Sequence, residues 1–111
     1  MTDFSASPPD DLVCLLTPRG ERTARASTRI TDEATQLAGF YRDMVLIRRM
    51  DTEAYALQRH GELGLWAPLF GQEAAQIGAG RALAQQDWVF PSYREHGIAW
   101  CREIGPEQLL G

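Results

Sequence analysis

Apolar side chains recur at helical spacing through the middle of the chain, which predicts a long helix over about residues 32–60. Thr31 is suited to cap its start, and Asp32 and Glu33 favour the positive end of the helix dipole. Gly61 is a plausible stop. The apolar positions are Leu37, Phe40, Tyr41, Met44, Ile47, Ala54 and Leu57.

Arginines interrupt this apolar stripe at Arg48 and Arg49, and an acid follows them at Asp51. Two interpretations stay open. One of the arginines pairs with Asp51 in a buried or interfacial ion pair, or this part of the helix faces solvent.

A second helix is expected from about residue 71 to residue 84, and it is built mostly of small side chains. Glycine inside a helix costs about 1 kcal/mol relative to alanine, so Gly78 and Gly80 need a structural reason. Close approach of another backbone is the reason that we expect.

Shorter elements complete this half of the chain. Residues 64–68 predict an extended segment, and Trp88 to Phe90 predicts a short apolar strand. A third helix is expected from about residue 93 or 94 to residue 103. Pro106 suits the first position of a further helix.

The first 30 residues predict a flexible N-terminal extension, followed by a structured part over 31–111. Residues 1–10 and about 22–30 are expected to be mobile. A hairpin is expected within residues 12–23, because the sequence from Thr17 to Gly20 fits a type I turn.

Composition narrows the class of protein. The net charge of −4 argues against nucleic-acid binding, and no apolar run is long enough for a membrane span. No secretion signal is recognisable, so we expect a cytoplasmic protein.

The chain contains no lysine, which excludes Schiff-base chemistry by this chain. Cys14 and Cys101 have no metal-ligand spacing and are interpreted as structural thiols.

The strongest chemical signal is the pair Tyr93 and Arg94, which follows Phe90, Pro91 and Ser92 on an expected turn. A guanidinium presents a planar fork of N–H donors that matches phosphate oxygens, and tyrosine adds a hydroxyl on a rigid ring. The pair therefore indicates a phosphate-binding site.

Five short motifs in a fixed order resemble the alpha subunit of 2-oxo acid dehydrogenases, the thiamine-diphosphate-dependent decarboxylating component of the pyruvate and branched-chain complexes. The resemblance covers about residues 31–111. The motifs are Tyr41-Arg42-Asp43-Met44, Arg48-Arg49-Met50-Asp51, Gln58-Arg59-His60-Gly61, Gly71-Gln72-Glu73-Ala74 and Tyr93-Arg94-Glu95-His96-Gly97.

The resemblance implies an α/β thiamine-diphosphate-binding fold for the full-length family, with this part mostly α-helical with short strands. It implies that Tyr93 and Arg94 contact the cofactor diphosphate and that Trp66 and Ala67 help to wall the substrate pocket. It also implies a heterotetramer with a beta subunit and acyl transfer to a lipoyl-bearing acyltransferase component.

Other family features are absent from this sequence. The Gly-Asp-Gly signature for magnesium and diphosphate does not occur, so magnesium ligands and catalytic residues are expected downstream. His60 and His96 do not match the active-site histidine; His60 suits a helix C-terminus, and His96 either packs on the third helix or touches the site. Glu73 is interpreted as a first-turn helix acid.

We therefore expect the N-terminal part of a pyruvate dehydrogenase alpha subunit that is inactive alone. The alternatives are a branched-chain 2-oxo acid dehydrogenase alpha subunit and a non-catalytic helical interaction module. Neither alternative includes a membrane or nucleic-acid partner.

Overall fold

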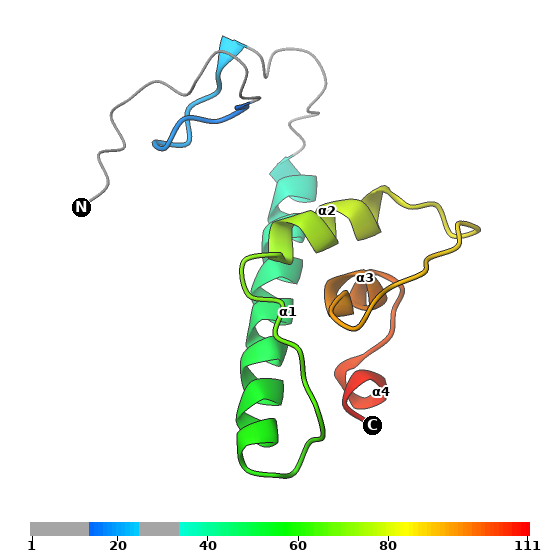
Figure 1. Ribbon diagram of the computed structural model, residues 1–111. Coiled ribbons are helices and arrows are strands. Elements are labelled where there is room, and N and C mark those ends of the chain that lie inside the picture. Colours follow the sequence, from blue (N-terminus) through cyan, green and yellow to red (C-terminus); the bar gives the residue numbers. More distant parts are fainter. Residues whose placement is uncertain (1–13, 25–33) are drawn as a thin grey trace. The chain divides into compact units, whose positions relative to one another are not determined.

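The computed structural model describes residues 14–24 and 34–111 (Figure 1). They belong to two units, 1–33 and 34–111, and each is described by itself. The expected tail over 1–10, the expected helix cap at Thr31 and most of the expected mobile stretch over 22–30 lie outside the described residues.

Residues 14–24 reverse direction in a tight turn. Gly20 donates its N–H to the Thr17 carbonyl at 2.9 Å and has a φ of 79°, a conformation that glycine adopts without strain. An antiparallel bridge joins Leu16 to Arg22, and the Thr23 N–H reaches the Leu15 carbonyl at 3.0 Å. The turn at Thr17 therefore has the hydrogen bond of a β-turn.

The long helix α1 spans Ala34–Arg59, close to the predicted range, and Gly61 follows it with a φ of 77°. The predicted stripe is only partly buried: Ile47 and Ala54 are fully buried, whereas Tyr41 is 67% exposed. Two acids share the buried face, which sequence hydropathy did not suggest. The buried positions are Asp43, Ile47, Met50, Asp51 and Ala54, which recur at helical spacing.

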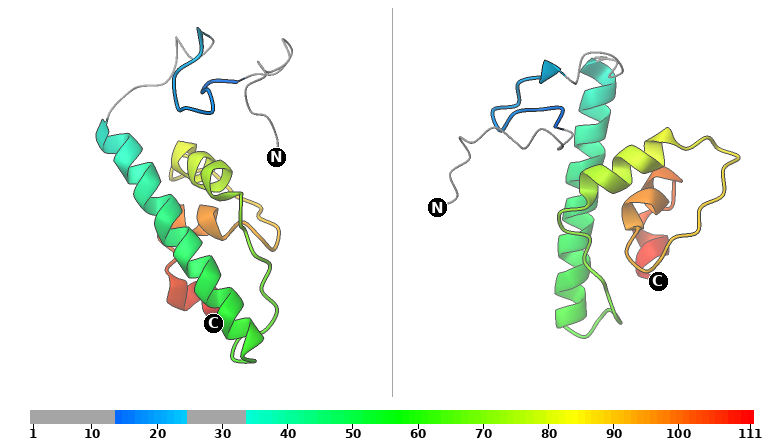
Figure 2. Two further views of the ribbon diagram at one scale, coloured as in Figure 1. Left: turned by 90° about the vertical axis from the view of Figure 1, so that its left-hand side faces the viewer. Right: turned by 45° about the horizontal axis from the view of Figure 1, so that its top comes forward.

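Three shorter helices follow: α2 over Glu73–Ala82, α3 over His96–Cys101 and α4 over Pro106–Leu110. Figures 1 and 2 show them on one side of α1, and α2 packs against both α1 and α3. α2 and α3 are each shorter at both ends than the sequence predicted. Pro106 does occupy the start of α4, as predicted.

The core of this unit forms where the connector over 62–72 returns along α1 towards α2 (Figure 1). Fully burying one large apolar side chain contributes about 1.5–3 kcal/mol, so these contacts hold the three elements together. The buried apolar residues are Ile47, Met50, Ala54, Trp66, Leu69 and Ile77.

One of the two glycines of α2 lies at a close helix contact. A Cβ atom on Gly80 would lie 2.8 Å from the Cys101 Cβ atom and 3.4 Å from the Ile98 Cα atom, so α3 approaches there as expected. Gly78 has nothing within 4 Å of the same position, so the expected reason does not apply to it within the described structure.

The expected strand at Trp88 to Phe90 is wrong. These residues lie in an irregular loop, and Trp88 and Phe90 are 86% and 90% exposed. The guanidinium of Arg102 holds the start of this loop by donating to the carbonyls of Ala84 at 3.2 Å, Gln85 at 3.0 Å and Asp87.

The described part of the chain is therefore mostly helical, and its β structure is limited to the isolated bridge in residues 14–24. The α/β fold of the full-length family stays a prediction.

Candidate phosphate-binding site

The loop that carries Tyr93 and Arg94 is closed by a short side-chain contact before α3. Ser92 donates its backbone N–H and its hydroxyl to the Glu95 carboxylate, at 2.6 and 2.7 Å. The bonds from Ser92 lower the pKa of Glu95. Glu95 therefore stabilises the turn and does not neutralise the neighbouring arginine through an ion pair.

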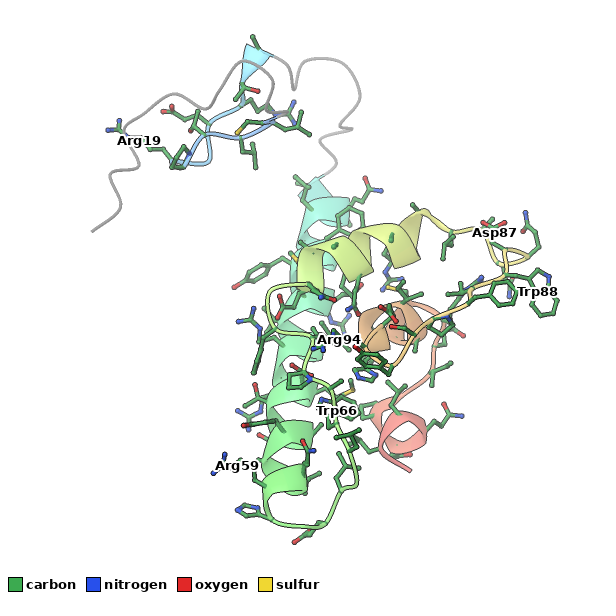
Figure 3. The ribbon with its side chains drawn as sticks, viewed as in Figure 1. Arg19, Arg59, Trp66, Asp87, Trp88 and Arg94 are labelled. Carbon is green, nitrogen blue, oxygen red and sulfur yellow. The ribbon has the colours of Figure 1, made fainter. Side chains whose placement is uncertain are left out.

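Arg94 keeps most of its donors available. One guanidinium N–H donates to the Pro68 carbonyl, and the guanidinium carbon lies 5.4 Å from the centroid of the Tyr93 ring. Among the described residues, no carboxylate forms an ion pair with Arg94. Tyr93 is 72% exposed. Tyr93 and Arg94 are neighbours in the sequence and lie on the loop before α3, where Figure 3 labels Arg94.

Trp66 lies in the core. It is 6% exposed, and its indole N–H donates to the Asp51 carboxylate at 2.7 Å. Its ring stacks on His96, with centroids 4.0 Å apart. Ala67 is half-buried beside it. A role for Trp66 and Ala67 in walling a substrate pocket stays a prediction.

The two histidines have different surroundings. His96 packs on Trp66; its Nε2 atom is buried without a partner in the described structure, and burial lowers the pKa of His96. His60 is exposed just beyond α1. His96 thus lies close to the loop as a packed residue.

Glu73 forms an ion pair with Arg48 and accepts the Gly71 N–H at 3.0 Å. The hydrogen bond from Arg48 is the largest influence on the carboxylate and lowers the pKa of Glu73. Glu73 is therefore a charged structural residue in the first turn of α2, in line with its interpretation as a helix acid.

Of the two interpretations left open for Arg48 and Arg49, the ion pair with Asp51 is not formed within the described residues. Arg48 turns to Glu73 on α2, and Arg49 pairs with Glu53 one turn along α1, at 2.5 Å. Asp51 is fully buried and also accepts the Leu69 N–H, at 3.1 and 3.2 Å from its two oxygens. Its partners come from a segment more than a dozen residues away, which helical spacing could not reveal.

A second buried acid was also missed. Asp43 pairs with Arg81 of α2, with a distance of 2.8 Å from the arginine Nε, and accepts the Trp100 indole N–H at 3.1 Å. An open hollow of about 360 Å³ lies beside this cluster, but neither Tyr93 nor Arg94 lines it. The position of Asp43 on the helical face of Ile47 was the signal that could have indicated its burial.

Two further features of the described part concern its potential metal ligands and its cysteines. Within residues 14–24 and 34–111, no group of three potential side-chain ligands is placed to hold a metal ion. Cys14 and Cys101 are free, and burial raises the pKa of Cys101, which fits the interpretation as a structural thiol.

No helix in the described ranges has the length and apolarity needed to cross a membrane. The cytoplasmic location stays a prediction.

Known proteins are similar to this chain over most of its length. The 3-methyl-2-oxobutanoate dehydrogenase subunit alpha of Mycobacterium tuberculosis is 48% identical over 85% of this chain and 26% of its own length. The pyruvate dehydrogenase E1 component subunit alpha of Bacillus subtilis is 40% identical over 73% of this chain and 22% of its own length.

The corresponding pyruvate dehydrogenase subunit of Mycoplasma genitalium is 42% identical over 73% of this chain and 22% of its own length. The chain thus spans about a quarter of these relatives. No solved structure matches it significantly. The family model described as the dehydrogenase E1 component matches residues 41–111, and the chain belongs to this family.

Proposed function

We propose that this chain supplies part of the diphosphate-binding site in the alpha subunit of a 2-oxo acid dehydrogenase. The observation that carries the proposal is Arg94, a half-buried arginine that has no carboxylate partner in the described structure and lies beside the exposed Tyr93. The acids nearest in sequence are engaged elsewhere, since Glu95 accepts from Ser92 and Asp87 accepts the Ala84 N–H at 2.8 Å.

The residues present fit a diphosphate. Arg94 has five N–H donors and, within the described residues, donates one of them to the Pro68 carbonyl, so a planar set of donors remains for phosphate oxygens. Tyr93 adds a hydroxyl at an exposed position. Thiamine diphosphate, when bound, would supply the ylid and the electron sink for decarboxylation.

The role of this chain is therefore to hold and orient the diphosphate end. Magnesium would accompany the diphosphate, with its ligands expected outside this sequence. Because the Gly-Asp-Gly signature is absent, the 111-residue chain alone is expected to be inactive. The full-length protein is expected to have the α/β thiamine-diphosphate-binding fold.

The activity we propose for the full-length protein is oxidative decarboxylation of a 2-oxo acid with acyl transfer to a lipoyl group. The partners would be a beta subunit and the lipoyl-bearing acyltransferase component. The names of the relatives as alpha subunits and E1 components support this proposal.

Pyruvate is the substrate that we propose first, in line with the relatives of Bacillus subtilis and Mycoplasma genitalium. A branched-chain 2-oxo acid is the second candidate, because the Mycobacterium tuberculosis relative is named for 3-methyl-2-oxobutanoate and shares 48% identity. Comparing kcat/KM for pyruvate and 3-methyl-2-oxobutanoate in the assembled enzyme decides between them.

The test of the cofactor site is a titration of thiamine diphosphate, with magnesium, against the full-length protein assembled with its beta subunit. Arg94→Ala should weaken binding about tenfold to a hundredfold, because hydrogen bonds to a charged group are lost. Arg94→Lys should restore only part of the affinity, since lysine keeps the charge and loses the planar fork.

Arg49→Ala is the matched control, since Arg49 is an exposed arginine paired only with Glu53 in the described structure. It should bind the cofactor as the wild type does. Equal affinities for wild type, Arg94→Ala and Arg94→Lys would remove Arg94 from the site. Failure of the wild-type assembly to bind thiamine diphosphate would favour a non-catalytic interaction module.

A further inference from the structure

A buried glutamine of α2 contacts the backbone of the loop that carries Arg94. Gln76 is 4% exposed. Its Nε2 donates to the Arg94 carbonyl at 3.1 Å, and its Oε1 accepts the Gly97 N–H at 2.9 Å. The Gln76 side chain thus forms hydrogen bonds with backbone groups on both sides of the junction between the loop and α3.

The contact is tight as well as polar. A Cβ atom on Gly97 would lie 2.9 Å from the Gln76 Cβ atom and 3.0 Å from its Oε1 atom, closer than side-chain atoms normally approach. α3 therefore begins directly against Gln76, and the glycine is needed because of this approach.

The amide has one orientation that fits. Its oxygen faces an N–H, and its nitrogen faces the Arg94 carbonyl and the Gln72 side-chain oxygen, the latter at 3.1 Å. Rotating the amide would place oxygen against oxygen and N–H against N–H. A buried amide is unfavourable unless its groups are paired, so these bonds explain why a polar residue occupies a position beside the apolar Ile77.

Arg94 is consequently held at both ends. Gln76 fixes the orientation of the peptide group at its carbonyl, and the Pro68 carbonyl receives one guanidinium N–H. A binding side chain that is restrained in this way loses less conformational freedom when its ligand arrives.

We infer that Gln76 is a positioning residue for the Tyr93–Arg94 loop and that its two loop hydrogen bonds preorganise Arg94 for a diphosphate. This inference rests on the proposed cofactor role of Arg94. Gln76 acts through the loop backbone and does not itself contact the ligand.

The experiment uses the full-length protein assembled with its beta subunit. Gln76→Leu replaces the amide with an apolar side chain of similar size and removes both loop hydrogen bonds. Gln76→Glu keeps an acceptor for the Gly97 N–H and loses the donor to the Arg94 carbonyl. Ile47→Val is the control, because it shortens a fully buried side chain of α1 that has no polar contact with the loop.

Three quantities are measured: thiamine diphosphate affinity by calorimetry with magnesium, the melting temperature without cofactor, and hydrogen exchange of residues 92–97 without cofactor. Gln76→Leu should weaken cofactor binding on the order of tenfold and speed exchange at Gly97. Gln76→Glu should leave Gly97 more protected than in Gln76→Leu and still bind more weakly than the wild type. Ile47→Val should lower the melting temperature and leave the affinity unchanged.

The two proposals fail in different ways. If Arg94→Ala weakens binding while Gln76→Leu and Gln76→Glu bind as the wild type does, the positioning role is wrong and the cofactor site stands. If all three bind as the wild type does, the cofactor role of Arg94 is wrong and the positioning role falls with it. A purely structural role for Gln76 predicts a lower melting temperature with unchanged affinity, which would also overturn the inference.

Discussion

Two irregular connectors each carry a tryptophan, and the two side chains differ in exposure. The first connector spans residues 62–72 before α2, and the second spans residues 83–95 before α3. Trp66 is 6% exposed and bonded to the buried Asp51, whereas Trp88 is 86% exposed on the loop (Figure 3). The difference shows that an aromatic residue in a connector is buried where a helix supplies both an apolar face and a partner for its N–H.

The largest expected difference between the two connectors is in the free energy of unfolding when each tryptophan is replaced. Trp66→Ala should lower the free energy of unfolding by about 3–5 kcal/mol, because a large buried ring and its contact with His96 are lost. Trp88→Ala should change it by less than about 0.5 kcal/mol. Urea unfolding followed by far-ultraviolet circular dichroism measures both. Similar losses in the two variants would break the comparison.

The next effect concerns one acid that binds each connector: Asp51 of α1 accepts from the first connector, and Asp87 lies in the second. Asp51→Asn should cost about 1–3 kcal/mol of unfolding free energy, since Trp66 and Leu69 both donate to this carboxylate and one good acceptor is lost. Asp87→Asn should cost roughly 0.5–1 kcal/mol, because Asp87 accepts one exposed backbone N–H from Ala84. Urea unfolding measures both variants. Equal losses of unfolding free energy in the two would mean that the burial of the carboxylate does not determine how much it stabilises the fold.

Within α2, which lies between the connectors, two glycines should show the same contrast at a smaller scale. Gly80→Ala should destabilise by about 1–3 kcal/mol, because its Cβ atom would press on Cys101. Gly78→Ala should stabilise by about 0.5–1 kcal/mol, because its position is open and alanine favours a helix. Thermal melting of both variants tests the expected opposite signs.

The smallest effect is a pH dependence that comes from His96, the first residue of α3, which stacks on Trp66 of the first connector. Burial lowers the pKa of His96 below its ordinary value of 6.5, so the unfolded chain binds the proton more readily than the folded one. This contribution to stability is fully present above pH 6.5 and is lost as the pH falls through the folded pKa.

His96→Gln should therefore flatten the fall of the unfolding free energy below pH 6.5 relative to the wild type. His60→Gln is the comparison variant, since it removes an exposed histidine and leaves the stack of His96 on Trp66 in place. An unchanged profile in His96→Gln would contradict the assignment of this pH dependence to His96.

Helices were predictable from the sequence because their signals are local. Apolar spacing and a glycine stop at Gly61 placed α1 close to its observed range, and Pro106 marked the start of α4. The prediction of a strand at Trp88 was wrong because a run of apolar and aromatic residues has the same sequence pattern whether or not a neighbouring strand pairs with it.

The candidate site was predictable only in part. Tyr93 and Arg94 were predicted from their chemistry and from the family motif; in the structure Arg94 lies over the Tyr93 ring, and their role in binding a diphosphate stays a prediction. Gln76 and the partners of Asp51 were missed, because both depend on contacts between segments far apart in the chain. A polar residue on the same face of α2 as Glu73 and Gly80 was the available signal for Gln76.

The hydrogen bonds of Arg102 have a consequence for the entropy of the exposed loop. Three carbonyls at its start are held by one guanidinium, and Ser92 and Glu95 close its far end. Restricting one residue to a single backbone conformation costs roughly 1–2 kcal/mol. At these two ends of the loop, the chain therefore loses this backbone entropy when it folds. Trp88 and Phe90, which lie between the two ends, bury almost no surface that would offset the loss.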